Sequence, residues 1–211
     1  MQTQEPIEFE HIFNPRTVAL IGASTENGFA HSLTNSKLWD RLYLVNPRYP
    51  ELAGKKCYAS ILDIPNDIDY VVVAVPATQV PKVLTECIAK GVKAAHVVTA
   101  GFSETGLPER QKLEDEVKGI AKGKIRLIGP NCMGVHCSKS GLTFIWDVSF
   151  DEGPVGVVSQ SGTFGVEFLN SRIVCGLAAG KVGHSFAMRN WPIVGRLHCT
   201  DILYAPPPRF R

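Results

Sequence analysis

Two segments of the chain combine a short apolar run with a turn of small and hydroxyl-bearing residues. The first is Val18-Ala-Leu-Ile-Gly-Ala-Ser24, and the second is Val155-Gly-Val-Val-Ser-Gln-Ser-Gly162. An apolar strand that ends in such a turn and leads into a helix offers backbone N–H groups and a positive helix end, which together bind phosphate. The two segments therefore predict a protein organised around phosphate groups, in a cofactor and in a transferred group.

The elements around these turns alternate between apolar strands and helical stretches, which indicates an α/β fold with a parallel sheet. We expect strands over 17–21, 41–45, 69–75, 94–99 and 124–128 and helices over 29–39, 80–88 and 109–121. The β-branched run in 69–75 is typical of a strand buried on both faces. Five such strand–helix units, over 8–140, predict a Rossmann-like domain.

A second unit follows a linker over 138–153, in which we expect one short strand at 142–145. It spans 152–211 and is predicted to be the start of an incomplete flavodoxin-like α/β domain, with a helix around 164–174 and a strand at 181–186. The tail over 187–211 breaks the pattern, because 187–199 shows no clean period and three prolines at 206–208 forbid a helix there.

Composition excludes several classes of protein. The net charge is +2 without a dense basic block, which argues against nucleic acid as a partner. No apolar run reaches the length of a membrane span, and the first residues show no secretory signal, so we expect a cytoplasmic protein without membrane contact. The six scattered cysteines are expected to be reduced thiols. Cys132, His136 and Cys137 lack the second ligand pair of a zinc site, so we expect no metal.

Ligands of open parallel sheets bind at the carboxyl ends of the strands. In this chain those ends carry small, hydroxyl and amide residues, which suit a nucleotide with several phosphates: Gly22-Ala-Ser24, Asn46-Pro-Arg48, Val75-Pro-Ala77, Thr99-Ala-Gly-Phe102 and Gly129-Pro-Asn131.

The identity of that nucleotide is constrained by two departures from the NAD pattern. Only Gly22 and Gly28 stand where the glycine-rich fingerprint is expected, and Asn46-Pro-Arg48 replaces the acidic residue that would bind the ribose. An arginine there favours a phosphorylated ribose, either the 2′-phosphate of NADP or the 3′-phosphate of coenzyme A. The plainer alternatives are a solvated surface charge for Arg48 and a simple tight turn for 22–24.

Six motifs in order resemble the nucleoside-diphosphate-forming acyl-CoA synthetases, relatives of the succinyl-CoA synthetase α subunit, over residues 10–186. They are Val18-Ala-Leu-Ile-Gly-Ala-Ser24, Val45-Asn-Pro-Arg48, Val75-Pro-Ala77, Thr99-Ala-Gly-Phe-Ser-Glu104, Gly129-Pro-Asn-Cys-Met-Gly134 and Gly156-Val-Val-Ser-Gln-Ser-Gly162.

The resemblance implies a coenzyme A site. It assigns the phosphates of coenzyme A to Gly22, Ala23 and Ser24, and its 3′-phosphate or adenine region to Asn46, Pro47 and Arg48. It assigns the adenosine and pantetheine path to Val75, Pro76 and Ala77, and the thiol end to Asn131. Ser161 and Gly162 would hold the transferred phosphoryl group at a helix N-terminus.

The same resemblance implies a reaction in which an acid, coenzyme A and ATP give acyl-CoA, ADP and phosphate through a phosphohistidine, together with a β-type ATP-grasp partner. The chain ends at Arg211, before the position expected for that histidine, and His184 and His198 do not match it. We therefore expect no catalytic residue here, no activity of the chain alone, and an interrupted reading frame or partial gene. The alternatives are a non-catalytic module that senses coenzyme A or acyl-CoA, and an NADP-dependent oxidoreductase.

Overall fold

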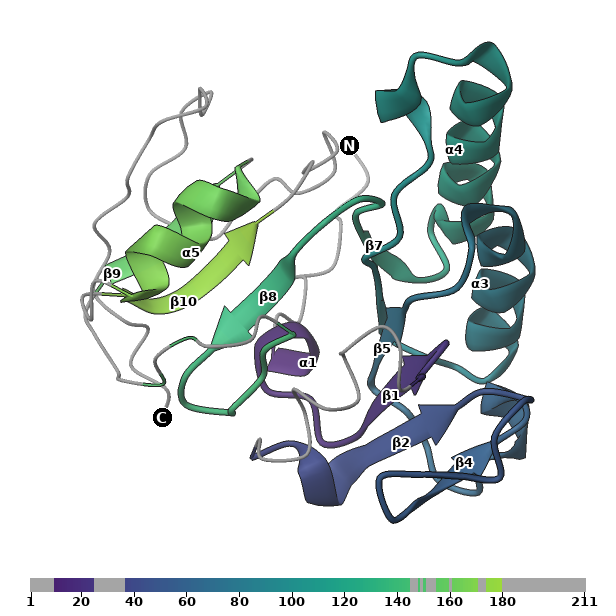
Figure 1. Ribbon diagram of the computed structural model, residues 1–211, viewed down its shortest axis with the longest axis horizontal. Helices are drawn as coiled ribbons and strands as arrows, with labels where there is room; N and C mark the ends of the chain where they lie inside the picture. The colour runs from purple at the N-terminus through teal and green to yellow at the C-terminus, as the bar shows by residue number, and fades with distance from the viewer. Residues whose placement is uncertain are drawn as a thin grey trace, which may run out of the picture.

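A mostly parallel sheet of seven strands forms the centre of the computed structural model (Figure 1). The model describes residues 10–24, 37–144, 148, 150, 155–159, 161–170 and 174–179. The strands lie in the order β3-β4-β2-β1-β5-β6-β7, and every pair is parallel except the β3–β4 hairpin. Their bounds are β1 Val18–Ile21, β2 Leu42–Val45, β3 Glu51–Leu52, β4 Lys55–Tyr58, β5 Tyr70–Val73, β6 Ala94–Val97 and β7 Arg126–Ile128. The predicted Rossmann-like α/β fold is thereby confirmed.

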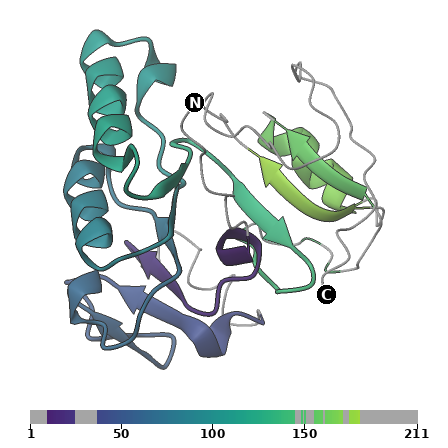
Figure 2. The ribbon, with the colours of Figure 1, turned by 180° about the vertical axis from the view of Figure 1, so that it is seen from behind.

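Both faces of this sheet are covered by apolar layers. Helices α3 (Val80–Ala89) and α4 (Pro108–Ala121) cover one face, and α1 (Glu10–Phe13) and strand β8 (Gly134–Cys137) lie on the other (Figures 1 and 2). Because side chains alternate along a strand, Ala19 joins the α3/α4 layer and Leu20 the opposite one. Four single-turn 3-10 helices complete this part: η1 Trp39–Arg41, η2 Ile61–Asp63, η3 Ala77–Gln79 and η4 Ser103–Thr105.

A second sheet has the strand order β8-β10-β9. Strand β9 (Val155–Ser159) leads into helix α5 (Gly162–Asn170), and β10 (Val174–Ala179) returns parallel to β9 and antiparallel to β8. Val135 of β8 packs in the same apolar cluster as β1 and β2 of the large sheet. Strand β8 therefore links the two sheets, pairing with one through its backbone and packing on the other through a side chain.

Several expected elements differ from those in the structure. The helix expected around 164–174 ends at Asn170, and Val174 already begins β10. The strand expected at 142–145 is reduced to one bridge between Cys137 and Leu142. Strands β3, β4, β8 and β10 were not expected, because they are short and their residues do not alternate cleanly. Most of the helix expected over 29–39, the strand at 181–186 and the tail 187–211 lie outside the described residues.

An ion pair between the exposed Arg16 and the buried Asp69 joins the amino ends of β1 and β5. Asp69 Oδ2 accepts hydrogen bonds from the backbone N and the Nε of Arg16, both at 3.0 Å, and Oδ1 accepts from Nη2 at 3.1 Å. These hydrogen bonds from Arg16 and the nearby His11 hold the pKa of Asp69 below its ordinary value, against the opposing effect of burial. Asp69 is 2% exposed, so this pairing also satisfies a carboxylate within the core.

No helix among the described residues is long and apolar enough to cross a membrane.

Replacing Asp69 tests this ion pair. Since the pKa of Asp69 is lowered in the fold, its contribution to stability is fully present above about pH 4 and is lost as the pH falls through that lowered pKa. We expect Asp69→Asn to reduce the free energy of unfolding at pH 7 by about 1–3 kcal/mol. In this variant the free energy of unfolding should also decrease less as the pH is lowered. Urea unfolding from pH 7 to pH 3 measures both effects. The exposed Asp67→Asn is the control, and equal urea midpoints for the two variants would contradict the role of Asp69.

Candidate functional site

The direction of the chain changes at β1, which lies between β2 on one side and β5 on the other. At such a point the connections leave on opposite faces of the sheet, and ligands of open parallel sheets bind beside it at the carboxyl ends of the strands. We call the loops that follow β1, β2, β5, β6 and β7 the carboxyl edge. Every coenzyme-contact residue expected from the sequence before the second phosphate motif lies in this edge.

Gly22 brings the loops after β1 and β5 into direct contact. Its φ is +90°, and a Cβ atom built there would lie 2.6 Å from Ala74 O and 3.1 Å from Val75 Cγ1. Its N–H donates to Val45 O at 2.9 Å, which continues the pairing of β1 with β2. The position therefore excludes every residue with a side chain, both by conformation and by space.

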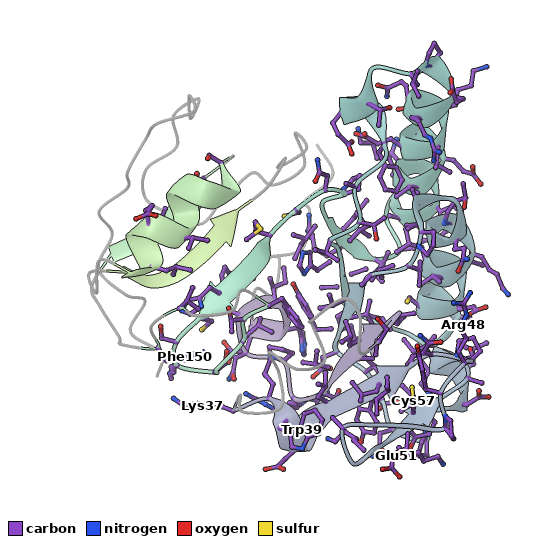
Figure 3. The ribbon with its side chains drawn as sticks, in the orientation of Figure 1. Lys37, Trp39, Arg48, Glu51, Cys57 and Phe150 are labelled. Atoms are coloured by element: carbon purple, nitrogen blue, oxygen red, sulfur yellow. The ribbon has the colours of Figure 1, made fainter. Side chains whose placement is uncertain are left out.

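Asn46 connects the loop after β1 with the turn after β2. Its Nδ2 donates to Ala23 O at 2.7 Å, and its Oδ1 accepts from the Arg48 N–H at 3.0 Å. Ala23 is fully buried, so its part is in the turn itself, while Ser24 is half-buried. Asn46 thus positions the turn that carries the exposed Arg48. In Figure 3 Arg48 lies near the arrowheads of β1 and β2, and Trp39 lies at the amino end of β2.

The loops after β5 and β6 lie against each other. Thr99 Oγ1 donates to Val75 O at 2.7 Å, and a Cβ atom built on Gly101 would lie 3.6 Å from Ala77 Cβ. Val75 is half-buried, Pro76 is exposed and Ala77 is buried. The loop after β6 was not among the expected contact residues. The signal for it was present in the sequence, because Thr99-Ala-Gly-Phe-Ser-Glu104 is one of the six motifs.

A buried histidine supports the loop after β7. His96 Nε2 lies 2.8 Å from Cys132 O, so this nitrogen carries the proton and donates. Gly134 has a φ of +86°, and a Cβ atom there would overlap the imidazole of His96. Burial lowers the pKa of His96 to about 4, so the ring is neutral near pH 7. In the same loop, the exposed Asn131 is held by its backbone N–H, which donates to Thr99 O at 2.9 Å.

The N-terminus of α5 lies against this same loop. A Cβ atom built on Gly162 would lie 2.5 Å from Met133 Cγ. The helix can approach the loop this closely only because Gly162 has no side chain. Ser159 Oγ accepts from the Ser161 N–H at 3.1 Å and donates to Ser161 O at 3.0 Å. The fold thereby brings the predicted phosphoryl contacts, Ser161 and Gly162, to the loop that carries Asn131.

Two other groups of residues were considered from the sequence: Cys132, His136 and Cys137 as metal ligands, and the late histidines His184 and His198. Among the described residues, no group of three or more His, Cys, Asp and Glu side chains is placed to hold a metal ion. Burial raises the pKa of Cys132 to about 11, and His136 Nε2 is paired with Ser138 Oγ at 3.1 Å. His184 and His198 lie outside the part of the chain that the structure describes.

Comparison with known proteins identifies relatives of this chain. Residues 16–138 match the family model described as a CoA binding domain. The chain is 44% identical over 160 residues to an acetate–CoA ligase (ADP-forming) of Methanocaldococcus jannaschii, a match that covers 74% of this chain and 22% of the relative. It is 36% identical over 161 residues to the acetate–CoA ligase (ADP-forming) II subunit alpha of Pyrococcus furiosus, covering 74% of this chain and 35% of the subunit.

A solved structure shows the same fold. The acetyl-coenzyme A synthetase 1 of Ca. Korarchaeum cryptofilum, in its apo form, superposes with a TM-score of 0.72 at 30% identity, over 82% of this chain and 40% of that one. The chain thus spans less than half the length of each of these relatives. Its matched part is homologous to the CoA-binding region of ADP-forming acyl-CoA synthetases. The chain belongs to the CoA binding domain family.

Proposed function

We propose that this chain binds coenzyme A along the carboxyl edge and serves as the CoA-binding part of an ADP-forming acid–CoA ligase. The observation that carries the proposal is the turn at Gly22. It lies at the switch point of the sheet, where ligands of this architecture bind, and it requires glycine for conformation and for space. Asn46, which follows β2, braces the same turn through its hydrogen bond to Ala23 O.

The phosphates of coenzyme A are assigned to the first two loops. The turn Gly22–Ser24 receives the diphosphate, because its small residues let a phosphate approach the backbone closely. Pro47 and Arg48 form the neighbouring turn, where an exposed guanidinium suits the 3′-phosphate. Asn46 then contributes by holding both turns, in addition to any contact of its own.

The remainder of the ligand is assigned to the loops farther along the edge. Val75, Pro76 and Ala77 offer apolar surface to the adenosine and the pantetheine arm. Asn131 stands beyond them and is assigned to the thiol end. The contact between Gly162 and Met133 supports a phosphoryl site next to that end, with Ser161 and Gly162 at the positive terminus of α5.

This placement fits the second half of the ligase reaction. An acyl phosphate loses its phosphate when the thiol of coenzyme A attacks the acyl carbon, and the products are acyl-CoA and inorganic phosphate. ATP and an ATP-grasp partner would supply the phosphoryl group through a histidine. Relatives named as alpha subunits support a partner of the β type. The chain's own described residues would bind, orient and stabilise charge in this scheme.

Gly22→Ala tests the turn, with Gly91→Ala as its matched control. Both glycines have positive φ, but a Cβ atom at Gly91 would meet nothing within 4 Å. We expect Gly91→Ala to lower the free energy of unfolding by about 1 kcal/mol and to leave CoA binding unchanged. Gly22→Ala is expected to raise the Kd for coenzyme A by at least about tenfold, measured by calorimetric titration. Equal CoA affinity in the two variants would argue against a diphosphate site at this turn.

Arg48→Ala tests the assignment of the 3′-phosphate. We expect it to weaken coenzyme A about tenfold and to leave dephospho-coenzyme A unchanged, since only the former has a phosphate for the guanidinium. Lys112→Ala, which removes an exposed cation from α4, serves as the control for net charge. Titration with NADP completes the experiment, because tighter binding of NADP than of coenzyme A would point to an oxidoreductase instead.

A further inference from the structure

Two carboxylates bind three successive backbone N–H groups in the loop after β6. Glu104 Oε1 accepts from the N–H of Gly101 at 2.6 Å and from that of Phe102 at 3.1 Å. Glu114 Oε2 accepts from the Ser103 N–H at 3.0 Å. Hydrogen bonds to a charged acceptor are stronger than those between neutral groups, so these two carboxylates hold the loop firmly.

The two carboxylates differ in their surroundings. Glu114 belongs to α4, is 6% exposed and pairs with Lys118 Nζ at 2.7 Å. Although burial opposes ionisation, the hydrogen bonds from Lys118 and Ser103 keep the pKa of Glu114 below its ordinary value. Glu104 is exposed and binds the backbone N–H groups of Gly101 and Phe102 within its own loop.

This loop lies between the segments assigned to the pantetheine arm and to the thiol end. On one side Thr99 Oγ1 bonds to Val75 O, and Gly101 approaches Ala77. On the other side the Asn131 N–H bonds to Thr99 O. A ligand that runs from Val75–Ala77 to Asn131 therefore passes the 99–103 backbone.

We propose that Glu104 is a positioning residue for coenzyme A, which holds Gly101–Ser103 in the conformation that lines the path of the pantetheine arm. This inference rests on the proposed function of the carboxyl edge. Because the N–H groups of this segment are bound by carboxylates and the segment carries negative charge, it suits the uncharged pantetheine arm and disfavours phosphate. The 101–103 segment thereby favours one orientation of coenzyme A along the carboxyl edge, in which the phosphates lie at the Arg48 end.

The test compares three variants of the full chain in calorimetric titrations. Glu104→Ala removes the acceptor, Glu104→Gln keeps an acceptor oxygen without the charge, and Glu116→Ala removes an equal charge from an exposed site on α4. Each is titrated with coenzyme A and with 3′-phospho-ADP, which is coenzyme A without its pantetheine arm. Hydrogen exchange of the Gly101 and Phe102 amides reports on the loop directly.

We expect Glu104→Ala to weaken coenzyme A about tenfold, the equivalent of one charge-assisted hydrogen bond, and to leave 3′-phospho-ADP unchanged. Exchange of the two amides should become faster, Glu104→Gln should restore most of the affinity, and Glu116→Ala should resemble the parent chain. Equal loss for both ligands would indicate a general structural defect and overturn the inference. If Glu104→Ala binds coenzyme A as the parent chain does, the role of Glu104 is overturned and the proposed function stands. If the parent chain itself does not bind coenzyme A, both are overturned.

Discussion

The central sheet is buried on both faces, and this constraint determines where the chain can carry polar chemistry. Every residue of β1, β5 and β6 is buried, so a polar side chain within these strands must find its partners inside the protein. His96 does so with one of its two nitrogens, whereas its Nδ1 and the hydroxyl of Tyr70 have no hydrogen-bond partner among the described residues. Groups that are to meet a charged ligand are therefore confined to the loops at the strand ends.

Those loops are held together by side chains that bond to backbone atoms of a neighbouring loop. Asn46 reaches the loop after β1, Thr99 the loop after β5, and His96 the loop after β7. Glu104 acts in the same way within its own loop. A binding surface arranged in advance loses less conformational entropy when a ligand binds, so these hydrogen bonds would favour the proposed binding of coenzyme A.

Strand β8 extends this arrangement to the second phosphate motif. It follows the loop that carries Asn131 and pairs with β10, and β9 and α5 are built onto β10. The close approach of Gly162 to Met133 places the N-terminus of α5 beside that loop. Two motifs that lie far apart in the sequence thus share one end of the proposed ligand path, an arrangement suited to transferring a group between phosphate and thiol.

The sequence by itself determined the α/β class, the strong central strands and the helices α3 and α4, because long apolar periodicities report directly on burial. It also indicated the loops of the carboxyl edge, whose small and amide residues stand out from their surroundings. It missed β3, β4, β8 and β10, and it left unassigned the hydrogen bonds of Asn46, Thr99 and Glu104 to loop backbone. Only the tertiary structure decided these features. The pairing of β8 with β10 and the hydrogen bonds of Asn46 and Thr99 depend on partners distant in the chain, which no local pattern records. The β3–β4 hairpin and the bonds of Glu104 are local, but they involve too few residues to give a periodic pattern.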